Sequence, residues 1–417
     1  MAGPFVLTLD ELLFFLGISL TVGYGLSFLL EKYGVPNVVI YLTTGFVFAH
    51  IFLSQEIIQH EQYEFWFRFI ETIALGLIGF KIGIELEADL LKQHSKTISI
   101  FILFEVFGAF ILVFLTMYLL SHSFLLSIIL AGLSTATAPA ATIEVIRRLK
   151  SKGEVTQKLK WILAFDDVVA VVIVEAILSF VIVSTLGHAF TISTFLIEIG
   201  REIGLALLIG IVIGFLLDLA IERLGKTFQI MELTLAGLIL VMGIAHTLDT
   251  SIILACMAVG AVTANREGNN FEQAESYLDI ILSPILIVFF LLVGAQIHIT
   301  NLYDPFPTMA MLYLLARSFG KIGGIYLSGP FANTNDTVRN NLGLGLLPQG
   351  GVALGLMAVA NDILIRAGME DLGNKIILTI VISTVFSEGI GAYTTSFGLK
   401  RAGEVGKAKS QPIKIDD

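Results

Sequence analysis

The stretch Trp161-Ile-Leu-Ala-Phe-Asp-Asp-Val-Val-Ala-Val-Val-Ile-Val174 places two adjacent acids, Asp166 and Asp167, in a run otherwise suited to the membrane interior. A charged side chain at the centre of a bilayer costs about 3 kcal/mol even on insertion scales, so such residues are rare and usually line an ion path. Just upstream, Leu133-Ser-Thr-Ala-Thr-Ala-Pro-Ala-Ala-Thr142 is rich in hydroxyl groups and contains a proline. We expect these two stretches to form one cation site.

The composition of the chain is that of a membrane protein. Of its 417 residues, 56% are hydrophobic and 14% are charged, and the mean hydropathy is +0.87. Soluble domains contain about 25% charged residues, so a polytopic membrane protein is indicated. The single cysteine, Cys256, excludes an intramolecular disulfide, and no glycine motif has the spacing that holds a nucleotide. We therefore expect no cofactor and no nucleic-acid partner, with a lipid bilayer as the surroundings.

Apolar runs long enough to cross a bilayer recur along the chain. A helix needs about 20 predominantly apolar residues to span the hydrocarbon core. The sequence predicts an all-α protein with about 13 spans, and an odd number places the two termini on opposite sides of the membrane. The predicted spans are 9–30, 37–53, 68–86, 97–120, 124–146, 159–184, 196–222, 230–248, 251–264, 278–298, 306–329, 340–360 and 374–398.

Lysine and arginine are distributed unevenly between the two sets of loops. The loops on one side, together with the tail, carry 18 of these residues, and the opposite loops carry 4. Cytoplasmic loops are enriched in lysine and arginine, so we expect an outside N-terminus and a cytoplasmic C-terminus in the plasma membrane. The 4 residues on the opposite side are Arg68, Arg201, Arg366 and Lys375, and Lys81, Arg317 and Lys321 fall inside spans.

Two spans are interrupted at corresponding places. The fifth is broken at Pro139 and the twelfth around Leu347-Pro-Gln-Gly-Gly351, seven spans later. An odd offset means that the two segments enter the membrane in opposite directions, as inverted-topology repeats require. We expect a single transporter domain over residues 1–400, with repeats at about 9–184 and 230–398, a linker helix at about 196–222, and a short cytoplasmic tail at 401–417.

The interrupted fifth span offers oxygen ligands. Because Pro139 has no N–H, the carbonyl of Thr135 loses its helical partner, and Ser134, Thr135 and Thr137 add hydroxyl oxygens. A free carbonyl at membrane depth is tolerated where protein or a water-filled cavity satisfies it, and oxygen ligands suit hard cations such as Na⁺. The alternative interpretation is two proline-kinked helices that pack tightly through small residues.

The acid pair suggests two different roles. Neighbouring residues on a helix point about 100° apart, so one aspartate faces a cavity that admits cations and protons while the other faces a neighbouring helix. Arg317 and Lys321 are four residues apart and share a helix face, so either is a candidate partner for Asp166. Lysine can lose its proton when buried, whereas arginine effectively cannot. The alternatives are a structural ion pair for the aspartates and snorkelling for the two cations.

Other charged residues at membrane depth are candidates for a pathway. Glu175 lies eight residues after Asp167 and hence on about the same helix face, two turns farther along. Glu71 and Lys81 fall in the predicted third span, and snorkelling or pairing with Glu85 would also account for Lys81. An isolated acid of this kind is more often a hydrogen-bonded residue that faces the helix bundle.

Several motifs together resemble the monovalent cation/proton antiporter superfamily over essentially the whole chain. The Asp-Asp pair after a proline-broken span is the most specific of them. Gly76-Leu-Ile-Gly-Phe-Lys-Ile-Gly-Ile-Glu-Leu86 is similar to the third-span signature of that family, and Pro284-Ile-Leu-Ile-Val-Phe-Phe-Leu-Leu-Val-Gly294 to its tenth-span motif. Leu347-Pro-Gln-Gly-Gly-Val-Ala-Leu354 resembles its discontinuous twelfth span.

The resemblance implies a sodium/proton antiporter fold in a homodimer, with a mobile ion-binding core, a fixed dimerisation domain and elevator-like alternating access. It makes Asp167 the carboxylate that binds either cation or proton and Asp166 its companion, paired with Lys321 or Arg317. With the hydroxyl residues of the interrupted span, the expected ion ligands are Asp166, Asp167, Thr135, Thr137 and Ser134, with Na⁺ held at Asp167, Asp166 and Thr135. Members with two aspartates tend to exchange charge electrogenically.

Two positions depart from the Asn-Asp branch of that superfamily. That branch usually carries Thr-Asp-Pro where this chain has Thr137-Ala138-Pro139, and often an acid where this chain has Lys81. Both departures favour the Asp-Asp branch. Potassium-efflux relatives carry a long nucleotide-binding tail, whereas the segment after the last predicted span is short and charged, so we expect sodium rather than potassium.

The sequence thus predicts a secondary active antiporter, not an enzyme, that exchanges Na⁺ or Li⁺ for H⁺. The alternative within transport is a K⁺/H⁺ antiporter or a K⁺ efflux transporter of the same superfamily. An intramembrane aspartyl protease would need its two acids on separate, facing helices, whereas these are adjacent on one. A channel would show no obligatory proton coupling, and a sensor would need a regulatory domain for which the sequence gives no sign.

Overall fold

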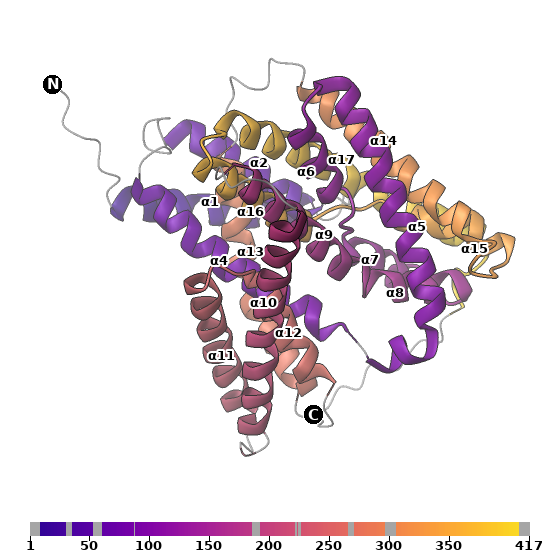
Figure 1. Cartoon of the computed structure of the whole chain (residues 1–417), viewed down its shortest axis with the longest axis horizontal. Helices are drawn as coiled ribbons and strands as arrows, with labels where there is room; N and C mark the ends of the chain where they lie inside the picture. Colours follow the sequence, from indigo (N-terminus) through magenta and orange to yellow (C-terminus); the bar gives the residue numbers. More distant parts are fainter. Residues whose placement is uncertain are drawn as a thin grey trace. The chain divides into compact units, whose positions relative to one another are not determined.

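The computed structural model describes residues 9–30, 36–52, 61–86, 88–185, 192–221, 223, 227–265, 271–296 and 306–407, and its elements in these ranges are helices (Figure 1). This confirms the predicted all-α class. The elements are α1 (Leu9–Leu30), α2 (Asn37–Phe52), α4 (Glu61–Ile84), α5 (Ala88–Ser121), α6 (Phe124–Leu133), α7 (Pro139–Arg148), α8 (Glu154–Leu163), α9 (Asp166–Thr185), α10 (Ile192–Ile221), α11 (Thr227–Thr247), α12 (Ile252–Ala264), α13 (Phe271–Ala295), α14 (Phe306–Ser328), α15 (Asp336–Asn341), the 3₁₀ turn η3 (Leu342–Gly345), α16 (Gly351–Arg366) and α17 (Glu370–Arg401).

Within the described ranges, four helices are both long and apolar enough to cross a membrane. They lie at His94–Ser121, Ile199–Ile221, Ile230–Thr247 and Glu370–Arg401. Further apolar helices are shorter than this, including the whole of α6 and α12. Helices shorter than a bilayer are expected where a span is interrupted, because the two halves together cross the hydrocarbon core.

The chain divides into two compact units, each built from three segments. Unit 1 comprises Met1–Ala88, Val171–Thr308 and Leu354–Val381, and unit 2 comprises Asp89–Ala170, Met309–Ala353 and Ile382–Asp417. Each unit therefore combines segments from both halves of the sequence. The predicted site residues divide between them: the aspartates, the hydroxyl residues, Arg317 and Lys321 belong to unit 2.

Helices of unit 1 pack through glycines that leave their backbones in contact. A Cβ at Gly79 of α4 would lie 2.4 Å from the carbonyl oxygen of Ile253 in α12, and one at Gly260 of α12 would lie 2.3 Å from that of Phe80. Helices α2 and α13 meet in the same way, at Gly45. Small residues at helix interfaces are typical of membrane bundles, where close van der Waals packing replaces the hydrophobic effect as the driving force.

Unit 2 contains both interrupted spans, which confirms the two predicted discontinuities. Helix α6 ends at Leu133 and α7 begins at Pro139, while η3 ends at Gly345 and α16 begins at Gly351. Pro139 occupies the first turn of α7, where its missing N–H costs nothing, rather than the helix interior that the sequence analysis assumed. The carbonyl of Thr135 is therefore free because the helix has already ended, not because a proline interrupts it.

The two interruptions are joined by direct hydrogen bonds. The amide of Ala138 donates to the carbonyl of Pro348 at 2.9 Å. The hydroxyl of Thr142 donates to the carbonyl of Gly345 at 2.7 Å. The amide side chain of Gln349 donates to the carbonyl of Leu133 at 2.9 Å. Because buried backbone groups must be paired, each interruption supplies partners that the other lacks.

The sixth predicted span, 159–184, is wrong as one continuous helix. Helix α8 ends at Leu163, a turn covers residues 164 and 165, and α9 begins at Asp166. The two aspartates therefore lie in the first turn of α9 rather than in a helix interior. This placement favours the carboxylates, because the N-terminal end of a helix carries a partial positive charge and unpaired amides.

Candidate functional site

Lys321 is fully buried in α14 and uses all three of its ammonium protons. Its Nζ donates to Oε2 of Glu105 in α5 at 2.6 Å, to the carbonyl of Thr135 at 2.7 Å and to the hydroxyl of Thr137 at 2.8 Å. An ammonium has three donors, so its hydrogen-bonding capacity is fully used. The carbonyl that the interrupted helix leaves free is thus bound by a lysine of the protein itself.

Arg317 lies one turn before Lys321 and ties the two interruptions together. Its guanidinium donates to the carbonyls of Ser134 at 3.0 Å and Ala136 at 2.7 Å, and to those of Leu347 at 2.6 Å and Pro348 at 3.3 Å. The first two carbonyls belong to the α6–α7 interruption and the last two to the η3–α16 interruption. The rigid, forked guanidinium suits this role because it presents several donors in fixed directions.

The structure assigns Lys321 a partner that differs from the one expected. The sequence analysis expected Lys321 or Arg317 to pair with Asp166, but the ion pair forms between Lys321 and Glu105. Both carboxylate oxygens of Asp166 are buried, and the Lys321 ammonium, Glu105 and the Thr137 hydroxyl lie near enough to act on this carboxylate. Asp166 therefore belongs to one buried polar cluster with Lys321, Glu105 and Thr137, in which Lys321 forms its ion pair with Glu105.

Asp167 is buried beside Asp166 in the first turn of α9. The buried residues Ala136, Ala170 and Ala353 pack together, which brings the α6–α7 interruption, the start of α9 and the start of α16 to one place. Small side chains allow this close approach of three backbone segments. Helix N-termini favour anions through their dipoles and unpaired amides, so the acid pair sits where carboxylates are stabilised.

The hydroxyl residues of the first interruption are buried, and Ser134 and Thr135 donate to carbonyls in the last turn of α6. Ser134 donates to the carbonyl of Ala131 at 2.6 Å, and Thr135 donates to that of Gly132 at 2.7 Å. Both hydroxyl protons are thereby used, and the lone pairs of these oxygens remain available as acceptors. In this arrangement the hydroxyls of Ser134, Thr135 and Thr137 can serve a cation only as oxygen ligands, which is the role the sequence analysis gave them.

Buried polar residues beside the second interruption were not predicted from the sequence. Gln349 donates to the phenol oxygen of Tyr313 at 2.9 Å as well as to α6. Glu388 of α17 is buried close to Gly350: a Cβ on that glycine would lie 2.5 Å from the Glu388 Oε1 atom. Glu388 also acts electrostatically on Arg317. Its position in the apolar last span was the signal that could have identified it.

Glu71, Lys81 and Glu175, proposed as pathway residues, belong to unit 1. Glu175 accepts a short hydrogen bond from the hydroxyl of Ser251, which also caps the N-terminus of α12. Glu71 is buried in α4, near the ion pairs of Asp362 with Arg68 and Arg366. Lys81 lies half-buried in the last turn of α4. Their role in a pathway stays a prediction.

Residues 16–396 match the family described as the transmembrane sodium/hydrogen exchanger. The chain belongs to the sodium/hydrogen exchanger family. This confirms the resemblance to the monovalent cation/proton antiporter superfamily, and it makes the chain an integral, multi-pass membrane protein.

One curated relative of this exchanger-family chain is a low-affinity Na⁺/H⁺ antiporter, NhaS1 of Synechocystis. The two are 25% identical over 304 residues, an alignment that covers 69% of this chain and 55% of NhaS1. The chain thus matches little more than half the length of that relative.

Solved structures of the sodium proton antiporter MjNhaP1 from Methanocaldococcus jannaschii share the fold of this exchanger-family chain. One, determined at pH 8, matches with a TM-score of 0.77 at 20% identity and covers 94% of this chain and 100% of the other. A second, from an electron-microscopy map, matches with a TM-score of 0.71 at 18% identity over 97% and 100% of the two chains. The likeness confirms the sodium/proton antiporter fold that the family resemblance implied.

Proposed function

We propose that this protein is a secondary active antiporter that exchanges Na⁺ or Li⁺ for H⁺ by alternating access, with Asp167 binding cation and proton in competition. The observation that carries the proposal is the pair of adjacent buried carboxylates at the start of α9, packed against two crossing helix interruptions in a sodium/hydrogen exchanger. Buried acids of this kind in membrane proteins commonly mark ion paths.

The oxygen atoms around the acid pair suit a hard monovalent cation. The carboxylates of Asp167 and Asp166, with Thr135 and the hydroxyls of Ser134 and Thr137, would supply carboxylate, carbonyl and hydroxyl ligands in place of water. A carboxylate that loses its proton can take the cation, and one that is protonated cannot, so the two ligands exclude each other at one site. This exclusion is what couples the two fluxes.

The ammonium group of Lys321 is a cation already bound at the proposed Na⁺ site. In the structure its ammonium binds the Thr135 carbonyl and the Thr137 hydroxyl, two of the atoms assigned to Na⁺. We infer that Na⁺ and the ammonium compete for these oxygens, and that Glu105 holds the lysine when it withdraws. Arg317, bound to four backbone carbonyls, keeps the two interruptions together throughout.

The wider setting follows from the family and the charge distribution. We propose a homodimer in the plasma membrane, with the N-terminus outside, the C-terminus in the cytoplasm and an elevator-like movement of the ion-binding part. The division of 18 to 4 in loop lysine and arginine supports this orientation. Such a protein is a transporter and not an enzyme, and regulation of internal pH and sodium is the physiological role that fits.

Potassium is the weaker candidate for the transported ion. The family and the relatives are described as exchangers of sodium and protons, and none of these descriptions supports the K⁺/H⁺ exchange considered from the sequence. The test is a proteoliposome assay with an imposed pH gradient, to which Na⁺, Li⁺, K⁺ or choline is added in turn. Dissipation by Na⁺ or Li⁺ alone supports the proposal, dissipation by K⁺ alone corrects the substrate, and no dissipation by any cation rejects exchange.

A further inference from the structure

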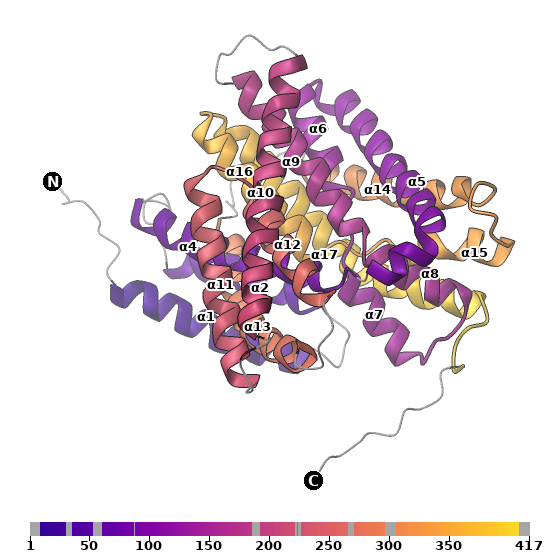
Figure 2. The ribbon, with the colours of Figure 1, turned by 60° about the horizontal axis from the view of Figure 1, so that its bottom comes forward.

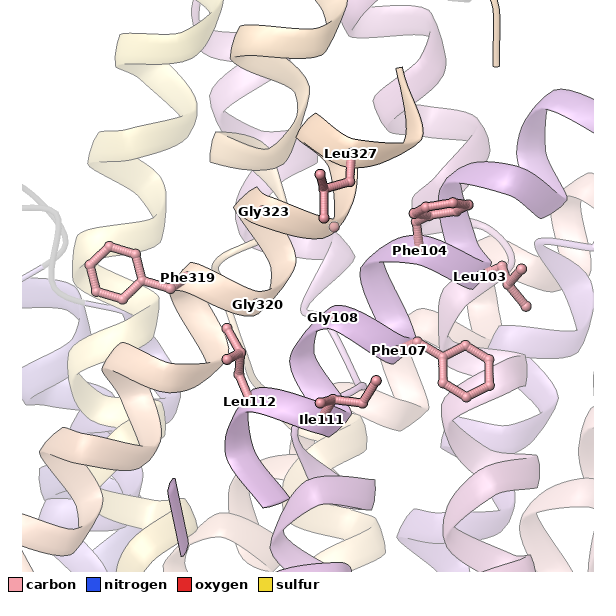
Figure 3. A pocket seen from close by; sticks show the side chains of 11 residues that line it. Leu103, Phe104, Phe107, Gly108, Ile111, Leu112, Phe319, Gly320, Gly323 and Leu327 are labelled. Carbon is pink, nitrogen blue, oxygen red and sulfur yellow. The ribbon is translucent and has the colours of Figure 1, made fainter. Parts of the chain in front are cut away.

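An apolar groove runs along unit 2 between α5 and α14 (Figure 3). Its eleven lining residues are all leucine, isoleucine, phenylalanine or glycine. Its volume of about 430 Å³ falls in the range of roughly 300–1,000 Å³ that small-molecule sites occupy. The ion-site proposal makes no use of this groove.

Glycines create the groove. A Cβ at Gly108 of α5 would lie 2.3 Å from the carbonyl oxygen of Gly320 in α14, and one at Gly324 would lie 2.2 Å from that of Phe104. The two backbones are therefore in contact along this line, as Figure 3 shows where the helices cross. At Gly323, in contrast, an added Cβ would meet nothing within 4 Å, so this glycine leaves an open space beside the contact.

Large apolar side chains flank that space. Leu103 and Phe107 of α5 are 54% and 52% exposed, and Phe319 and Leu327 of α14 are 65% and 60% exposed. The α5 part of the lining falls inside His94–Ser121, one of the four helices suited to crossing the membrane. The α5 side of the groove therefore belongs to a helix whose length and composition suit the hydrocarbon core.

The chemistry of the groove selects its occupant. A ligand with polar groups would lose their hydration and find no hydrogen-bond partner among side chains of this kind, which is costly in an apolar site. A flexible hydrocarbon chain has no such groups. Near the C-terminal end of α14, close to Leu327, the guanidinium of Arg339 lies over the ring of Tyr326 at 3.9 Å and donates to its carbonyl. An aromatic residue with a cation is typical of the membrane–water interface.

We propose that this groove binds one acyl chain of a membrane phospholipid, whose phosphate lies towards Arg339. The site is independent of the ion exchange proposed above, although it bears on the same helices. Phe104 and Gly320 line the groove, and their sequence neighbours Glu105 and Lys321 form the buried ion pair. A bound acyl chain thus holds α5 and α14 together beside that pair.

The test uses the full-length protein in bilayers that contain phosphatidylglycerol with a photoreactive diazirine midway along one acyl chain. After illumination and digestion, mass spectrometry maps the labelled residues. We expect labels concentrated on 103–112 and 319–327, and loss of these labels in Gly323→Leu, whose side chain fills the open space. In the matched control Gly243→Leu, an exposed glycine of α11 that also has nothing within 4 Å of its Cβ receives the same side chain, and the labels persist.

Other outcomes overturn the proposal. Labels spread evenly over the groove and the exposed face of α11 mean ordinary lipid contact without a site. Cross-links to a second copy of the chain mean that the groove is a protein interface. If Gly323→Leu does not fold, Leu327→Asn, which puts an amide at the exposed end, is expected to reduce the groove labels, and unchanged labels contradict the acyl-chain site. Arg339→Gln tests the phosphate end: it should lower labelling by phosphatidylglycerol below that of the wild type, and unchanged labelling removes Arg339 from the site.

Discussion

Lys321 of α14 and Glu105 of α5 form an ion pair 2.6 Å long in which neither side chain is exposed to any extent. Removing two charges from water is costly, and a buried pair persists only where further hydrogen bonds satisfy the remaining donors and acceptors. Thr135 and Thr137 supply these for the lysine. The pair therefore links the α5–α14 crossing to the α6–α7 interruption.

Breaking this pair on one side is predicted to destabilise the protein more than removing it altogether. Lys321→Met leaves a buried carboxylate and is expected to cost about 3–5 kcal/mol, whereas the double variant Lys321→Met with Glu105→Leu should recover much of the loss. Thermal unfolding of the purified single and double variants measures the coupling. Additive effects of the two substitutions would contradict the pairing.

Arg317→Lys is predicted to be damaging although it keeps the charge. Arg317 bonds four carbonyls of the two interruptions, and a lysine has only three donors on a single atom, so it cannot reproduce that fork. Each buried carbonyl that loses its donor costs about 1–3 kcal/mol. Thermal unfolding and cation-driven dissipation of a pH gradient should both show the loss. Wild-type stability and exchange in this variant would show that the carbonyl contacts are dispensable.

Gly350 is predicted to tolerate no side chain. A Cβ at this position would lie 2.5 Å from Glu388 Oε1 and 3.0 Å from the Cβ of Ala138, so Gly350→Ala displaces the buried Glu388 carboxylate and presses against the first interruption. Transport should fall sharply. The matched control is Gly389→Ala, since a Cβ there meets nothing within 4 Å. Equal exchange rates in the two variants would argue against a close contact between the two interruptions at Gly350.

The segment after α17 passes close to α8 (Figure 2), where the Glu404 carboxylate binds the start of that helix. Its carboxylate accepts from the amides of Val155 at 2.7 Å and Thr156 at 2.8 Å, which serves as an N-terminal cap. Loss of such a cap costs about 0.5–2 kcal/mol, so Glu404→Ala should lower the melting temperature measurably. Glu144→Gln, at an exposed acid of α7, serves as the control and should change the melting temperature little.

Glu404→Ala is also expected to weaken the apparent affinity for Na⁺, because only two residues separate α8 from the aspartates at the start of α9. An unchanged affinity would limit Glu404 to a structural role.

The sequence was sufficient for the features that depend on composition and local pattern. Apolar run length indicates the all-helical class, and the prolines mark the positions of the two interruptions near Pro139 and Pro348. The cost of a membrane carboxylate indicates the burial of Asp166 and Asp167 in protein. These signals lie within single stretches of chain, and the structure bears them out.

Features that depend on three-dimensional packing were not predictable in this way. The partner of Lys321 depends on how α5 and α14 are rotated and on their close approach at Gly108 and Gly320. Hydropathy predicts neither the rotation of a helix nor its distance from another helix. The end of α8 at Leu163 was missed because the turn at residues 164 and 165 contains no glycine or proline. Glu105 falls inside the predicted span 97–120, but its partner lies 216 residues away in sequence.

The measurement that tests the central claim most directly is proton release on Na⁺ binding. Purified wild-type protein and Asp167→Asn, in weakly buffered detergent with a pH indicator, would receive NaCl or choline chloride at a series of pH values. If Asp167 binds Na⁺ and H⁺ in competition, NaCl releases protons from the wild type, more Na⁺ is needed as the pH falls, and Asp167→Asn releases none. Equal release from both proteins, or Na⁺ binding without release at every pH, would contradict the account.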